Sequence, residues 1–280
     1  MTAVRAIRLI AKRELVTRKR AFLISTGLIL FIFIAGIVAL ELSGVTEGAT
    51  FPEEKGDRIL AMFGTIVLFG TIIGYGQMAL IGVVEEKSSR VVEVILGSVE
   101  PSKLLAGKIV GIGVFALAQT GAILGTTGGL LFALDTLPLP PGTAANLLNI
   151  FGFFMLGFAF YSTVYAAFGA LLARTESASN AAGPLNLIVA VGYFTAIITT
   201  QAGDNFFARV LSLLPPFTPI VMPMRIVNGY APIWEVALAV FLVLGAIYWV
   251  NRLAARIYIG GVMRGGAKSG LREAWRTAGL

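Results

Sequence analysis

The chain of 280 residues contains no cysteine and no histidine, and only 13% of its residues are charged. Without cysteine it has neither a disulfide framework nor a thiolate metal site. Without histidine it lacks the usual general base, proton relay and transition-metal ligand. Soluble domains carry about a quarter charged residues. The composition therefore argues against a soluble enzyme.

Nucleotide-binding motifs are also missing. The sequence GAKS at 266–269 shares only Lys-Ser with a phosphate-binding loop, and AGKI at 106–109 lacks the hydroxyl residue that would hold magnesium. A serine hydrolase within the membrane would need a lysine base, and no lysine lies within a predicted span. We therefore expect no bound cofactor and no catalysis by this chain.

Long apolar runs dominate the remainder, because 57% of the residues are hydrophobic. Runs of about 20 apolar residues suffice for a helix to cross the hydrocarbon core. They are continuous rather than alternating, which favours helices over strands. The prediction is an all-α polytopic protein with one transmembrane domain at 21–250. Its six transmembrane helices are predicted at 21–40, 59–84, 109–134, 147–173, 181–200 and 233–250.

Basic residues concentrate at both ends of the chain and predict its orientation. Residues 1–20 are a basic stretch with apolar positions at helical spacing, typical of an amphipathic interface helix. A signal peptide is the alternative, but the basic region is long for one. Residues 251–280 form a basic tail, whereas the 41–58 loop is short and acidic. The positive-inside rule therefore places both termini in the cytosol, and this distribution fits membrane topology rather than nucleic-acid binding.

The charged segment 85–108 separates the second and third predicted spans. Glu85 and Glu86 are expected in the first turn of a short helix, where the helix dipole favours acids. Gly97-Ser98 would end that helix, and Glu100-Pro101-Ser102 would begin the next. A short helix at the cytosolic surface suits the docking of a partner. A solvated loop with an ordinary charge run is the alternative.

The proline-rich stretch 211–230 precedes the last span. It is too interrupted for a straight span and too apolar for a free loop, so we predict a short helix or re-entrant hairpin at the non-cytosolic face. An interfacial loop with aromatic anchors is the alternative. The residues assigned to this element are Pro215, Pro216, Phe217, Pro219, Pro223 and Arg225.

Polar groups inside the predicted spans are few and mild, and Tyr75, Gln77 and Gln119 are the candidates to line a pathway. Glu41 and Glu235 lie at span ends. Ion-driven transporters usually carry an ionisable group near the midplane. Energy is therefore expected from a partner.

Glycine pairs at GxxxG spacing occur in the second and third predicted spans. For these we favour packing within one subunit over a dimer seam or mobile gate. The glycines concerned are Gly70, Gly74, Gly121, Gly125 and Gly129.

Two stretches resemble a known family. EEKSSRVVEVILGSVEPSKLLAGKIVG, at 85–111, is similar to the loop between the second and third spans in permeases of type-2 ABC exporters. LPPFTPIVMPMRI, at 214–226, resembles the segment before the last span in the sodium-exporter-like, Nat-type branch. One departure is the 41–58 loop, which is too short for the large extracellular domain that many members of that branch carry.

The resemblance implies a permease subunit in the inner membrane of a prokaryote, paired with a cytosolic ATPase that holds ATP and magnesium. It also implies a second permease copy, identical or not, and an outer gate at 211–230. The segment after the second span would be a coupling helix that contacts the ATPase. Its charged contacts would be Glu85, Glu86, Arg90 and Glu93, and its apolar contacts Val92 and Ile95. A stand-alone channel or secondary transporter, and a membrane-embedded enzyme or scaffold, are the competing hypotheses.

Overall fold

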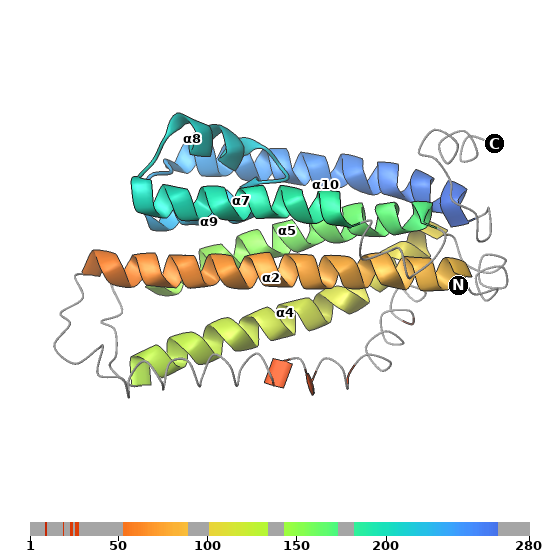
Figure 1. Cartoon of the computed structure of the whole chain (residues 1–280), viewed down its shortest axis with the longest axis horizontal. Helices are drawn as coiled ribbons and strands as arrows, with labels where there is room; N and C mark the ends of the chain where they lie inside the picture. The colour runs from red at the N-terminus through yellow and green to blue at the C-terminus, as the bar shows by residue number, and fades with distance from the viewer. Residues whose placement is uncertain are drawn as a thin grey trace.

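The computed structural model describes residues 53–88, 101–133, 143–172 and 182–262, with six isolated positions before them (Leu9, Lys19, Leu23, Ile24, Thr26 and Gly27). Every element in the four ranges is an α-helix, and no strand occurs there. The helices are α2 (Glu53–Ser88), α4 (Pro101–Ala133), α5 (Thr143–Leu171), α7 (Gly183–Ala202), α8 (Phe206–Leu213), α9 (Thr218–Val227) and α10 (Ile233–Val262) (Figure 1).

Five of these helices are long and apolar enough to cross a membrane. The qualifying stretches are Gly64–Glu85, Ala106–Thr126, Ala145–Leu171, Gly183–Ala202 and Ile233–Ala254. The all-helical, multi-span class is therefore confirmed. The predicted interface helix at 1–20 and first span at 21–40 lie outside the described residues except for the six isolated positions.

Several helix ends differ from the predicted ones. Helix α2 begins at Glu53, so the acidic stretch up to Arg58 is helical rather than loop. It also runs on to Ser88, which places Glu85 and Glu86 in its last turns and not in the first turn of a new helix. Glu and Lys are strong helix formers, so the charged residues prolong the helix after the apolar run has ended. Helix α4 does begin at Pro101, within the predicted start signal.

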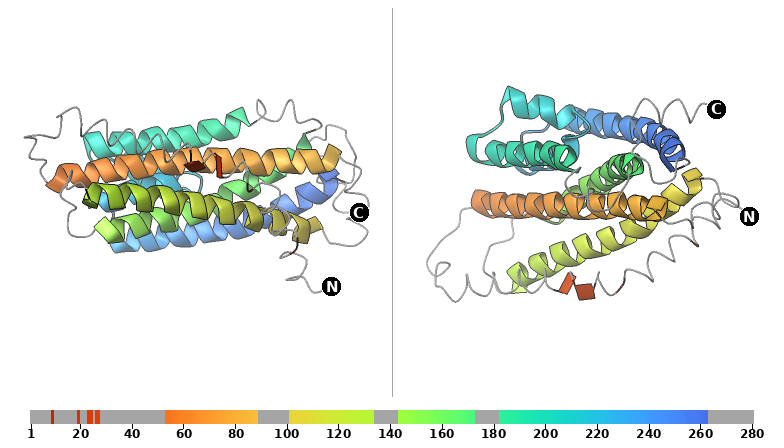
Figure 2. Two further views of the ribbon diagram at one scale, coloured as in Figure 1. Left: turned by 90° about the horizontal axis from the view of Figure 1, so that it is seen from below. Right: turned by 45° about the vertical axis from the view of Figure 1, so that its right-hand side comes forward.

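Helix α5 occupies the centre of the bundle and contacts α2, α4, α9 and α10 (Figure 2). One buried cluster joins α2, α4, α5 and α10 through side chains such as Leu68, Ile112 and Phe154. A second joins α2 and α5 to α7 and α9 through Leu80, Tyr161 and Ile220. Helix α4 lies near α2 at its Pro101 end and diverges from it towards Ala133 (Figure 1).

The close helix contacts do not use the predicted glycine pairs. A Cβ added at Gly70, Gly74, Gly125 or Gly129 would meet no described atom within 4 Å, and one at Gly121 would meet only Phe151, at 4.0 Å. Packing of these pairs within the subunit is thus not found among the described helices.

Other glycines form the seam between α2 and α5. A Cβ at Gly169 would lie 2.6 Å from the backbone oxygen of Leu80, and one at Gly64 would lie 2.8 Å from the Ile150 side chain. A small residue at these points lets two helix backbones approach closely.

Candidate functional site

Helices α8 and α9 form a hairpin between the end of α7 and the start of α10. The Asn205 side chain caps α8 by accepting a hydrogen bond from Ala208 N, at 2.8 Å. The chain turns at Pro215-Pro216-Phe217, and α9 then begins with Pro219 in its first turn. Proline fits there because the missing N–H would have no partner within the helix. This hairpin covers most of 211–230, where a short helix or re-entrant hairpin was predicted, although its first helix starts earlier, at Phe206. Its re-entrant character stays a prediction.

The guanidinium of Arg225 binds the open end of the hairpin to its neighbours, and its side chain is fully buried. Nε and Nη2 donate to the two carboxylate oxygens of Asp204, at 2.9 and 3.1 Å, which joins α9 to the chain before α8. Nη1 donates to Glu235 Oε2 on α10, at 2.7 Å, and to Ser212 Oγ on α8, at 2.8 Å. Nη2 also donates to the Tyr230 carbonyl, at 3.3 Å.

Glu235 has a second cationic partner. Its Oε1 forms an ion pair with Arg209 on α8, whose side chain is 49% exposed. The Arg209 guanidinium also lies 5.7 Å from the centre of the Trp234 ring. The ion cluster of Asp204, Arg209, Arg225 and Glu235 thus holds two cations and two anions.

Ion pairing offsets the cost of burying the charges of Arg225 and Glu235, because a lone buried charge is strongly destabilising. Burial alone lowers the pKa of Arg225, but hydrogen bonds with Asp204 and Glu235 outweigh that effect and raise it above its usual value. Arg225 therefore stays charged.

The sequence analysis assigned Arg225 to this element but missed its partners. It placed Glu235 at a span end, and the residue does lie in the first turn of α10 and of the stretch Ile233–Ala254; its full burial was not predicted.

The turn of the hairpin contacts the middle of the bundle. The Tyr161 hydroxyl on α5 donates to the Pro216 carbonyl. A Cβ at Gly157 of α5 would lie 2.7 Å from Pro219, and one at Gly192 of α7 would lie 3.5 Å from Phe217. Tyr161 and Gly157 both lie well inside the apolar stretch Ala145–Leu171. The turn is thus held deep among the long helices, while the ion cluster closes the opposite end.

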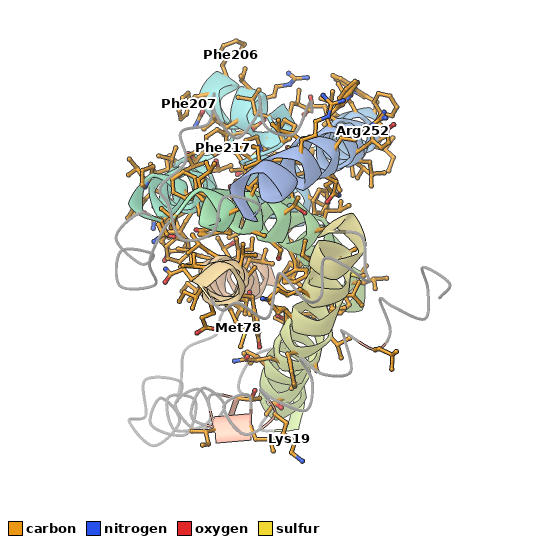
Figure 3. All side chains as sticks on the ribbon, turned by 90° about the vertical axis from the view of Figure 1, so that its right-hand side faces the viewer. Lys19, Met78, Phe206, Phe207, Phe217 and Arg252 are labelled. Atoms are coloured by element: carbon orange, nitrogen blue, oxygen red, sulfur yellow. The ribbon has the colours of Figure 1, made fainter. Side chains whose placement is uncertain are left out.

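The outer side of α8 is apolar and uncovered. Phe206 is 82% exposed and Phe207 is 62% exposed, and both project away from the bundle (Figure 3). Arg252 projects from α10 in the same view. Its guanidinium donates to the Tyr248 hydroxyl at 3.1 Å.

Two of the three pathway candidates lie together. The Tyr75 hydroxyl on α2 donates to Gln119 Oε1 on α4, and both side chains are buried. Gln77 is half-buried and takes no part in this bond. Any lining role of the three stays a prediction.

The predicted coupling residues lie largely beyond what the structure describes. Glu85 is exposed near the end of α2, and Glu86 belongs to the same helix. Arg90, Val92, Glu93 and Ile95 lie outside the described residues.

One buried cation near this end went unnoticed in the sequence. Lys108 lies within the stretch Ala106–Thr126, is 2% exposed, and donates to the Gly82 carbonyl on α2. A lysine therefore does lie within a span, contrary to the sequence prediction. The sequence analysis had counted Lys108 as the last residue of the surface segment 85–108.

Metal ligands do not gather in the part of the chain described here, where no three Asp or Glu side chains lie close enough to share an ion. What the geometry offers instead is mechanical: a bundle of apolar helices, a hairpin packed against it, and polar contacts that tie helices together.

The chain is a polytopic helical membrane protein, and its sequence matches the model of a known family. The profile described as "ABC-2 family transporter protein" covers residues 46–251, so the chain belongs to that family. It is a permease family rather than a catalytic one.

The chain is similar to two uncharacterized proteins. It is 31% identical to YhaP of Bacillus subtilis (strain 168), over 83% of this chain and 59% of that protein. It is 24% identical to MJ1024 of Methanocaldococcus jannaschii, over 80% of this chain and 55% of that protein. The chain thus spans less than two thirds of the length of either relative.

Proposed function

We propose that this chain is the membrane-spanning permease subunit of an ATP-driven exporter of the type-2 ABC class, in its Nat-type branch. The family match over 46–251 is the observation that carries the proposal. The sequence supports it, because it contains apolar spans but no Walker A loop for ATP. A separate cytosolic ATPase would bind ATP and magnesium, and a second permease copy would complete the pathway.

The proposed topology has six spans, with the first at 21–40, and an interface helix at 1–20. Both termini lie in the cytosol, and the protein resides in the inner membrane of a prokaryote. The distribution of Lys and Arg supports this orientation, since basic residues crowd the termini and the 85–108 segment.

The α8–α9 hairpin is proposed as a re-entrant element that gates the outer end of the pathway. Its turn contacts Tyr161, within a candidate span, which supports insertion into the bilayer. Non-helical backbone is tolerated within the depth of the membrane where other parts of the protein surround it. The ion cluster would hold the hairpin shut at its outer end.

Coupling is proposed to occur through the last turns of α2 and the segment that follows them. ATP binding would close two ATPases against this segment and shift the equilibrium between two arrangements of the permease. The charged residues Glu85, Glu86, Arg90 and Glu93 would contact the ATPase together with Val92 and Ile95.

Co-purification with a candidate ATPase that has no spans of its own tests the proposal. The complex should form, hydrolyse ATP and move solute outward in liposomes. Reversing charge with Glu85→Lys and Arg90→Glu should abolish its assembly. The control is Arg252→Glu, a reversal at an exposed cation of α10, which should leave assembly intact.

Uphill transport by the purified chain without any ATPase would overturn the proposal in favour of a secondary transporter. Failure of every candidate ATPase to associate with the chain would also overturn it.

A further inference from the structure

The buried ammonium of Lys108 ties two helices together at one end of the bundle. Lys108 on α4 is 2% exposed and donates to the Gly82 carbonyl of α2. Val83 and Val84, which follow Gly82 on α2, and Ile112, one turn beyond Lys108 on α4, are also fully buried. A hydrogen bond from a charged donor is stronger than a neutral one, and all the more so where water is excluded.

The position of this bond along the two helices is symmetrical. Gly82 lies about two turns before the end of α2 at Ser88, and Lys108 about two turns after the start of α4 at Pro101. The bond therefore joins the two helices close to the points where each connects to residues 89–100, the middle of the proposed coupling segment.

A further polar contact joins α4 to α2. Tyr75 bonds Gln119 deeper in the bundle. Beyond this contact α4 diverges from α2 towards Ala133 (Figure 1). The two helices are thus held together over the part nearest the coupling segment and separate further along.

We propose that Lys108 is a positioning residue that makes the Ser88 end of α2 and the Pro101 end of α4 move as one unit. A force that the ATPase applies to residues 89–100 would then move both helices together and would not separate them. This inference rests on the proposed function for the source of the force. The tie itself rests only on the burial of Lys108 and its bond to Gly82.

Distance measurement between two spin labels tests the tie directly. The chain has no cysteine, so Ser88→Cys and Ser102→Cys supply the only thiols, by near-isosteric changes at the two helix ends. In nanodiscs the labelled protein should give a narrow distance distribution. Lys108→Met keeps the side-chain volume but removes the donor, and it should broaden the distribution about twofold because the buried charged tie is lost.

Two further variants separate this role from simple packing. Lys108→Arg retains a donor and should restore most of the narrow distribution. Ile112→Val removes one methylene from a buried position one turn further along α4 and should leave the distribution narrow. A distribution in Lys108→Met as narrow as that of the starting protein would overturn the proposal.

The same labels report on the force when the ATPase is bound. Trapping the complex with a non-hydrolysable ATP analogue should leave the label distance unchanged in the starting protein and lengthen it in Lys108→Met. ATP hydrolysis, measured separately with ATP, should continue in both. Lengthening in the starting protein would show that the helices move separately, which overturns the proposal. Failure to bind any ATPase would instead defeat the proposed function, and the measurement on the permease alone would still decide the role of Lys108.

Discussion

At the scale of single residues, the ion cluster is the most unusual feature of the described structure. Arg225 gathers acceptors from three different parts of the chain: Asp204 before α8, Ser212 at its end and Glu235 on α10. Breaking a buried ion pair by removing one partner is far more damaging than trimming an exposed charge. The cluster should therefore be strongly coupled.

Replacing Arg225 by Met should destabilise the protein by about 3–5 kcal/mol, because it leaves the buried Glu235 with one partner fewer. The double variant Arg225→Met/Glu235→Leu should be less destabilised than the sum of the single variants, with a coupling energy of about 1–3 kcal/mol. Thermal unfolding in nanodiscs measures the stability of the two single variants and of the double variant.

Arg252→Met is the matched control, because it removes an exposed cation that bonds Tyr248, and it should cost under about 1 kcal/mol. If the destabilisation of the double variant equalled the sum of the two single variants, Arg225 and Glu235 would not be coupled.

Composition and motif reasoning found Arg225 but not its partners. Asp204, Arg209 and Glu235 lie on both sides of a turn whose geometry is not encoded in charge spacing, so their convergence emerges only when the hairpin folds. Lys108 was overlooked for a related reason, since its partner is a backbone carbonyl that leaves no trace in the sequence.

At the scale of helices, the glycine seam between α2 and α5 determines how closely they pack. Gly169→Ala should destabilise the protein by about 1–3 kcal/mol, because the new methyl would press on the Leu80 backbone, which cannot yield as a side chain does. Thermal unfolding provides the measurement.

Gly70→Ala provides the contrast, since that position is open in the described structure. It should be neutral or stabilising by up to about 1 kcal/mol, because alanine loses less chain entropy on folding. Equal damage from the two substitutions would contradict the assigned seam.

The turn of the hairpin should loosen when its contact with α5 is lost. Tyr161→Phe removes one hydrogen bond to Pro216, worth about 1 kcal/mol, which corresponds to roughly fivefold faster exchange of the turn amides. Hydrogen exchange of the peptide covering 211–221 measures this change.

Tyr165→Phe is the control for the hairpin, because it removes the bond to Asn186 on α7 instead. It should leave exchange in the turn unaltered. Faster exchange in the control but not in Tyr161→Phe would contradict the assigned contact.

Sequence periodicity identified the long helices well, because continuous apolar runs of this length have few alternatives. It located their ends less well. Pro184 lies in the first turn of α7, where proline suits a helix start. Charged residues at the ends of α2 were assigned to a preceding loop and to a separate following helix, because their polarity, and not their helix propensity, was taken as the boundary signal.

At the scale of the whole molecule, the proposed orientation places the hairpin outside and the end of α2 inside. Phe206→Cys, at an exposed position on α8, should react with a membrane-impermeant maleimide added to intact cells. Glu85→Cys, exposed near the end of α2, should react only after the membrane is permeabilised. The reverse pattern would invert the topology.

The ion cluster carries one final consequence. Its two guanidinium groups and two carboxylates sum to no net charge, although they lie at the end of the bundle where the hairpin would move. Displacing a charge through the membrane field requires electrical work in proportion to that charge. Only a movement that keeps Glu235 with the hairpin is neutral in this field. Because Glu235 lies on α10, a hairpin that left it behind would carry Arg209, Arg225 and Asp204, and therefore one net positive charge, through the field.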